Sequence, residues 1–62
     1  MKVPVKFSDK ITREVDLEHV MVYENGKAKE VYRSSIFTNP ATGKPCYVIF
    51  DPETKSIAVK EV

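Results

Sequence analysis

The stretch that decides the fold is residues 36–51, IFTNPATGKPCYVIFD, in which two apolar segments flank the polar sequence Asn-Pro-Ala-Thr-Gly-Lys. Gly43 is suited to the positive φ that a tight turn requires. The second segment, 46–50, is the most hydrophobic run of the chain and has no polar alternation. A strand of this kind is usually covered on both faces. We therefore predict a β-hairpin whose second arm lies at the centre of the molecule.

A second turn with the same chemistry follows at residues 50–55. Asn39 in the first turn and Asp51 in the second each precede a proline. The side chain of Asn or Asp at this position accepts hydrogen bonds from backbone N–H groups further along the turn. The final strand, 56–62, is expected to direct Ile57 and Val59 inward. The two turns thus predict a three-stranded antiparallel meander over the second half of the chain, with 46–50 in the middle.

The first half of the chain is read as two more hairpins. Residues 2–7 alternate apolar and polar side chains, and residues 11–15 return after a short turn. The dipeptide Asn25-Gly26 is the strongest short-range signal for a two-residue hairpin. It predicts the register of the flanking strands, which places Glu24 opposite Lys27, Val20 opposite Val31 and Glu18 opposite Arg33.

Two helical alternatives compete with this interpretation. Residues 16–24 also contain apolar side chains at helical spacing, with Asp16 available as an N-cap. Residues 27–37 have an apolar stripe at Ala28, Val31, Tyr32 and Ile36 that a following Asn-Pro would end. Strands are favoured in both places because the hairpin signal at Asn25-Gly26 fits only strands.

Size and composition restrict the class of protein. A chain of 62 residues is one domain, here 1–62, with a small core. One cysteine and one histidine provide neither an internal disulfide nor a zinc site, and no segment is apolar enough for a signal peptide or a membrane span. We expect a cytoplasmic, all-β protein: a small curled antiparallel barrel, SH3-like or OB-like, of five to six short strands.

Catalytic chemistry has few candidates in this sequence. His19 and Cys46 are the only side chains that titrate near neutrality, and nothing in the sequence brings them together. The segment Thr42-Gly43-Lys44 lacks the upstream glycine of a phosphate-binding loop. We predict no enzyme activity, no cofactor and no metal, and we expect a binding module.

The first candidate partner is nucleic acid, most simply duplex DNA. Phosphate binding by a curled sheet needs Lys or Arg, and contacts to bases or sugars need apolar or aromatic side chains. The predicted binding residues are Met21, Tyr23, Lys27, Lys29 and Arg33. The alternative is that these cations form a solvated face paired with Glu18, Glu24 and Glu30. The formal net charge of +1 favours the alternative, because interleaved acids cancel the field that attracts phosphate.

Several segments resemble the small crenarchaeal chromatin proteins. They are Pro4-Val5-Lys6, Glu18-His19-Val20 and the turn Phe37-x-x-Pro40-x-Thr42-Gly43-Lys44. The resemblance implies an SH3-like barrel that binds duplex DNA in the minor groove through a three-stranded sheet. The chain departs from the family on that sheet. His19 and Met21 stand where the family has Lys and Trp, and Tyr47 and Ile49 stand where it has a basic strand.

Tyr47 and Ile49 suggest the second candidate partner. If Cys46, Val48 and Phe50 fill the interior, these two side chains point to the opposite face of the same strand. An apolar outer face would be buried against another protein, most simply in a homodimer. A ligand-binding barrel is a further alternative.

Overall fold

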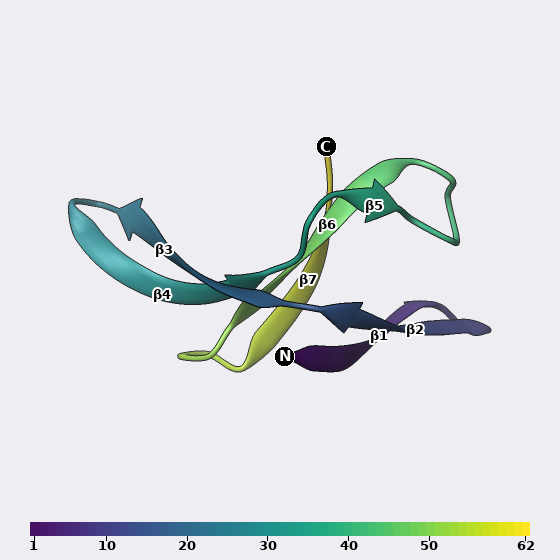
Figure 1. Cartoon of the computed structure of the whole chain (residues 1–62), viewed down its shortest axis with the longest axis horizontal. Coiled ribbons are helices and arrows are strands. Elements are labelled where there is room, and N and C mark those ends of the chain that lie inside the picture. The colour runs from purple at the N-terminus through teal and green to yellow at the C-terminus, as the bar shows by residue number, and fades with distance from the viewer.

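The computed structural model describes all 62 residues and contains seven strands and no helix. They are β1 (Lys2–Ser8), β2 (Ile11–Asp16), β3 (Glu18–Glu24), β4 (Lys27–Arg33), β5 (Phe37–Thr38), β6 (Pro45–Asp51) and β7 (Ser56–Glu61) (Figure 1). Every strand pair is antiparallel. The prediction of a curled antiparallel all-β fold is confirmed, and the helices considered for 16–24 and 27–37 do not form. No helix of the chain could cross a membrane.

The strand β6 lies at the centre of the larger sheet. It pairs with β7 along one edge, and with β5 and the end of β4 along the other. The meander predicted for the second half of the chain is therefore present. The hairpin predicted for residues 36–51 is also present, but its first arm is only the two residues of β5.

A bulge separates β4 from β5 and raises the number of strands above the five to six expected. The amide of Ser34 donates to the carbonyl of Val48 at 2.9 Å, and Ser34 Oγ in turn accepts a hydrogen bond from the amide of Val48 at 2.9 Å. The side chain thus takes the place of a backbone carbonyl in the ladder. Residues 35 and 36 then pair with no residue of β6, and pairing resumes between Phe37 and Cys46.

The turns follow the predicted chemistry. Asn25 and Gly26 have φ values of 53° and 77°, as a type I′ turn requires, and the register across β3 and β4 is the predicted one. Gly43 has a φ of 74°. Asn39 Oδ1 accepts a hydrogen bond from Ala41 N at 2.8 Å, and Asp51 Oδ1 accepts one from Glu53 N at 2.9 Å.

The core lies between the β1–β2 hairpin and one face of the larger sheet. Its four buried side chains are Val5, Val15, Leu17 and Val48, and half-buried side chains that include Phe37, Phe50 and Val59 surround them. Ile57 and Val59 point to the core face, as predicted, because they oppose Phe50 and Val48. Val59 packs against the core, whereas Ile57 is 45% exposed.

The β3–β4 hairpin projects from the body of the molecule (Figure 1). β4 pairs with β6 only at Tyr32 and Arg33, so the rest of the hairpin extends past the sheet. The molecule measures 38 × 20 × 16 Å, and its radius of gyration of 12.1 Å exceeds the roughly 10.6 Å expected for a compact chain of this length. The two sheets share no ladder, so the predicted barrel is an open, curled half-barrel.

Candidate functional site: the open face of the sheet

The pairing register divides the side chains of the larger sheet between two faces. The face against the β1–β2 hairpin, here called the core face, includes Cys46, Val48 and Phe50. Side chains alternate along each strand, and directly paired residues share a face. The opposite face, here called the open face, therefore bears the following residues: Glu18, Val20, Val22 and Glu24 of β3, Lys27, Lys29, Val31 and Arg33 of β4, Tyr47, Ile49 and Asp51 of β6, and Ser56, Ala58 and Lys60 of β7.

The centre of the open face is apolar. Its six apolar side chains are Val20, Val22, Val31, Tyr47, Ile49 and Ala58, contributed by four neighbouring strands. Val31 is only 3% exposed because the sheet curls around it, whereas the other five are half-buried. A hollow of about 270 Å³ lies between β4 and the β6–β7 hairpin, lined by Val22, Val31, Ile49 and Ala58 together with polar residues.

An ion pair holds one end of this hollow. Lys29 Nζ lies 2.6 Å from Asp51 Oδ2 and 3.9 Å from Glu24 Oε2. The hydrogen bond with Asp51 raises the pKa of Lys29 against the opposing effect of its burial. The same hydrogen bond lowers the pKa of Asp51, and the backbone amide of Glu53 adds to this effect. Lys29 thus joins the projecting hairpin to the β6–β7 turn as a charged pair at neutral pH.

The other cations of the open face form no ion pair. Lys27, Arg33 and Lys60 have no carboxylate oxygen within 4 Å. The guanidinium carbon of Arg33 lies 6.0 Å from the centroid of the Tyr47 ring, at the outer limit of a cation–π contact. Positive charge therefore borders the apolar centre at three separate points.

The residues predicted for nucleic-acid binding do not share one face. Lys27, Lys29 and Arg33 lie on the open face with Tyr47 and Ile49, the pair predicted for a protein interface. Met21 and Tyr23 lie on the opposite face. Tyr23 opposes Ala28 and Met21 opposes Glu30, which places both of them on the core face of the projecting hairpin. A single surface through all five predicted residues is therefore corrected to two surfaces.

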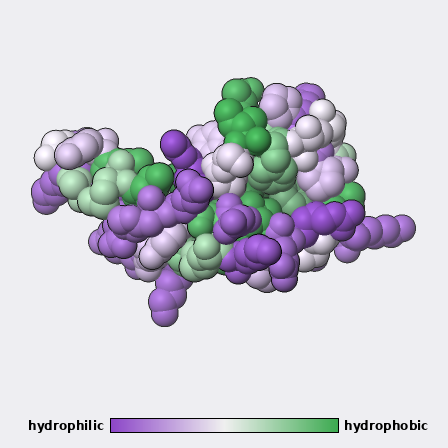
Figure 2. Space-filling model, viewed as in Figure 1, coloured by the Kyte–Doolittle hydropathy of each residue, from purple (hydrophilic) through white to green (hydrophobic).

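On its core face, the projecting hairpin reaches beyond the part of the sheet that β1 and β2 cover. Met21 is 52% exposed there and Tyr23 is 82% exposed. In Figure 2 the lobe at the left, where Figure 1 places this hairpin, shows a green, hydrophobic patch bordered by white and purple, more hydrophilic atoms. His19 Nε2 contacts Glu30 Oε1 at 2.8 Å, and its ring packs edge-on against Tyr32.

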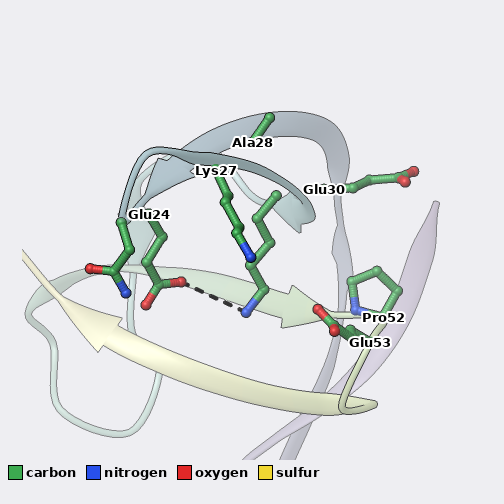
Figure 3. Close-up of a pocket in the computed structure, with 8 residues that line it drawn as sticks. Glu24, Lys27, Ala28, Glu30, Pro52 and Glu53 are labelled. Atoms are coloured by element: carbon green, nitrogen blue, oxygen red, sulfur yellow. Dashed lines mark ion pairs between the residues drawn. The ribbon is translucent and has the colours of Figure 1, made fainter.

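A wider, polar cleft separates the tip of the projecting hairpin from the β6–β7 turn. Its volume is about 780 Å³. Figure 3 shows Glu24 and Lys27 pointing into it from the hairpin, with Pro52 and Glu53 on the other side, and marks the ion pair of Glu24 with Lys29. Cations and carboxylates alternate around this cleft, so it favours no ligand of one charge. The structure contains no group of three or more His, Cys, Asp or Glu side chains that could hold a metal ion.

The β3–β4 register, which the sequence predicts, is enough to place Met21 and Tyr23 on one face and the cations on the other. The predicted register, with Glu24 opposite Lys27, already implies that Tyr23 opposes Ala28 and therefore faces away from Lys27. The ion pair between Lys29 and Asp51, in contrast, could not be predicted from the sequence. Asp51 follows a different strand, and only the curl of the sheet brings it to Lys29.

No family model, curated protein or solved structure matches this chain. The resemblance to crenarchaeal chromatin proteins and the SH3-like or OB-like assignment therefore stay predictions.

Proposed function

We propose that the chain is a non-catalytic binding module that takes a protein partner on its open face. The observation that supports this is the apolar centre of that face, where Val22, Tyr47 and Ile49 stay half-exposed. Contiguous exposed apolar surface with a polar rim is typical of protein-interaction sites. The rim of this surface combines cations and carboxylates, which suits a protein better than a polyanion.

The environments of His19 and Cys46 also fit a binding role better than a catalytic one. The thiol of Cys46 has no exposed surface. His19 is engaged with Glu30, and both lie on the core face of the sheet. Neither side chain borders the open face, where we place the partner.

Selection of peptides from a random phage-displayed library on the immobilised chain tests this proposal. We expect enriched peptides with apolar residues that bind the wild type and lose binding to Ile49→Lys. Tyr23→Lys is the matched control, because this residue is exposed on the opposite face, and it should bind like the wild type. Circular dichroism confirms that both variants are folded. Peptides that bind Ile49→Lys as well as the wild type would contradict the proposal.

Duplex DNA is a second candidate partner of the open face. Lys27, Arg33 and Lys60 are free of ion pairs and so remain available for phosphates. We expect DNA binding to appear in a gel shift at low salt and to weaken as salt rises, because phosphate contacts release counterions. The double variant Arg33→Gln, Lys60→Gln should weaken it, while Lys10→Gln in the β1–β2 turn should not. No shift at the lowest ionic strength would remove this candidate.

A further inference from the structure

The strand β3 is a free edge of the larger sheet and pairs only with β4. In a hairpin with a two-residue turn the flanking pair, here Glu24 and Lys27, exchanges backbone hydrogen bonds. The even-numbered residues of β3 therefore direct their backbone groups to β4. His19, Met21 and Tyr23 direct their N–H and C=O groups outward, where no other strand of this chain meets them.

The β3 edge has few of the features by which proteins prevent edge strands from pairing, because its carboxylates, Glu18 and Glu24, stand only at its two ends. Proline, lysine, bulges and short length are the usual ones. β1 contains Pro4 and two lysines, β7 contains Lys60, and β5 has only two residues. β3 is seven residues long and contains no proline, no lysine and no bulge. Its centre, 20–22, is Val-Met-Val, and Met21 is 52% exposed.

The sequence of β3 is nearly symmetric about Met21. It reads Glu-His-Val-Met-Val-Tyr-Glu, with valine on each side of Met21, then one aromatic ring on each side, then one glutamate on each side. A second β3 that pairs antiparallel about a two-fold axis at Met21 would place Val20 opposite Val22 and His19 opposite Tyr23. Pairs of β-branched side chains and pairs of aromatic side chains stabilise antiparallel strands. A two-fold interface requires such self-complementarity.

We infer that a second copy of this chain pairs with β3 and that the two larger sheets join into one across a two-fold axis at Met21. Edge pairing leaves both faces of the sheet uncovered, so the open face stays free for the partner of the proposed function. At the ends of the joined strands Glu18 faces Glu24 of the partner subunit. Arg33 and Lys27 oppose these carboxylates within each copy and moderate the repulsion. The apolar side chains at the centre therefore stabilise the dimer, and the facing carboxylates at its ends destabilise it.

A cross-link tests the position of the two-fold axis. In a hydrogen-bonded antiparallel pair the Cα atoms lie about 5.5 Å apart, which is within the range of a disulfide. Met21→Cys should therefore form a disulfide-linked dimer under mild oxidation. Tyr23→Cys is the control, because its Cα lies roughly 13 Å along the strand from the equivalent residue of the second copy, and it should stay unlinked. Cys46 is fully buried and does not compete. Equal cross-linking of the two variants would overturn the two-fold axis at Met21.

Sedimentation up to millimolar concentration tests the pairing itself. The wild type should show a monomer–dimer equilibrium. Met21→Pro removes an outward N–H without taking a donor from the β3–β4 ladder, and it should be monomeric and folded by circular dichroism. Glu24→Gln removes the like-charge opposition at two symmetric places, and it should dimerise between about twofold and thirtyfold more tightly.

The outcomes separate this dimer from the proposed function. Ile49→Lys should lose peptide binding and dimerise like the wild type, while Met21→Pro should do the reverse. A wild type that stays monomeric at all concentrations would overturn the dimer and leave the peptide result unaffected. A dimer in which Met21→Pro and wild type associate equally would also overturn it.

Discussion

The side chain of Ser34 joins β4 to β6. Its hydroxyl accepts the hydrogen bond that a backbone carbonyl accepts in a regular ladder. Its hydroxyl accepts from the buried amide of Val48 and donates to the carbonyl of Ser35 at 2.9 Å. Ser34→Ala leaves that amide without an acceptor, and we expect a loss of about 1–3 kcal/mol in the free energy of unfolding, measured by urea denaturation. Ser35→Ala is the control, because the Ser35 side chain is exposed and makes no hydrogen bond. Equal midpoints for the two variants would contradict this role.

The ion pair of Lys29 and Asp51 gives the stability a defined pH dependence. The folded-state pKa of Asp51 lies below its ordinary value of 3.8, so its contribution is present above that pH and is lost as the pH falls through the lowered value. The pKa of Lys29 is raised above 10.5, so its contribution is present below that pH and is lost as the pH rises through the raised value.

We expect Asp51→Asn to lower the thermal midpoint at pH 7 and to flatten its fall in acid. Melting curves of the wild type and the variant from neutral to acid pH measure both effects. Asp9→Asn is the control, because Asp9 lies in the exposed β1–β2 turn and forms no ion pair. A midpoint of Asp51→Asn that falls with acid as steeply as that of the wild type would assign the acid sensitivity to other carboxylates.

Among the elements, the β6–β7 turn contains a conformation that its sequence does not favour. Lys55 has a φ of 58°, in the left-handed region where a Cβ atom is unfavourable. Lys55→Gly should raise the free energy of unfolding by up to about 1 kcal/mol, since relief of this strain exceeds the entropy cost of glycine. Lys10→Gly in the β1–β2 turn, where φ is not positive, should be destabilising. Urea denaturation of both variants decides the sign.

The elements set by short-range chemistry were predictable from the sequence. The Asn25-Gly26 turn specified the β3–β4 register, and Asn39 and Asp51 specified their turns. The interruption between β4 and β5 was not predictable, because it depends on a hydrogen bond that the Val48 amide, fourteen positions away, donates to Ser34 Oγ. The candidate site was predictable in part. Lys27, Lys29 and Arg33 share a face, as predicted, but Met21 and Tyr23 lie on the opposite face because side chains alternate along β3.

For the molecule as a whole, the connection between the two sheets depends on a few side chains. Leu17, 2% exposed, lies in the single-residue link between β2 and β3 and belongs to a core cluster of four buried residues. Leu17→Ala should cost about 2–5 kcal/mol, a large part of the stability of so small a domain. Ile57→Ala is the control, because this side chain is 45% exposed and should cost much less. Similar losses for the two variants, measured by urea denaturation, would contradict a core centred on Leu17.

Cys46, Val48 and Phe50 lie on the covered face of the central strand, as expected, although the residues of that strand do not themselves determine which face is covered. Cys46–Tyr47–Val48–Ile49–Phe50 is apolar on both sides, so alternation does not distinguish the core face from the open face. The distinction arises only when β1 and β2 pack against Val48 and leave Tyr47 and Ile49 half-exposed.

Because Cys46 is buried, the reactivity of its thiol reports local opening of the central sheet. The thiol has no exposed surface. Burial raises its pKa, and the negative charge of nearby Glu61 raises this pKa further. Because the thiolate is the reactive form, a thiol reagent must wait until the central strand separates from its neighbours. The labelling rate of this single cysteine therefore measures how often the middle of the sheet opens, without any probe being introduced.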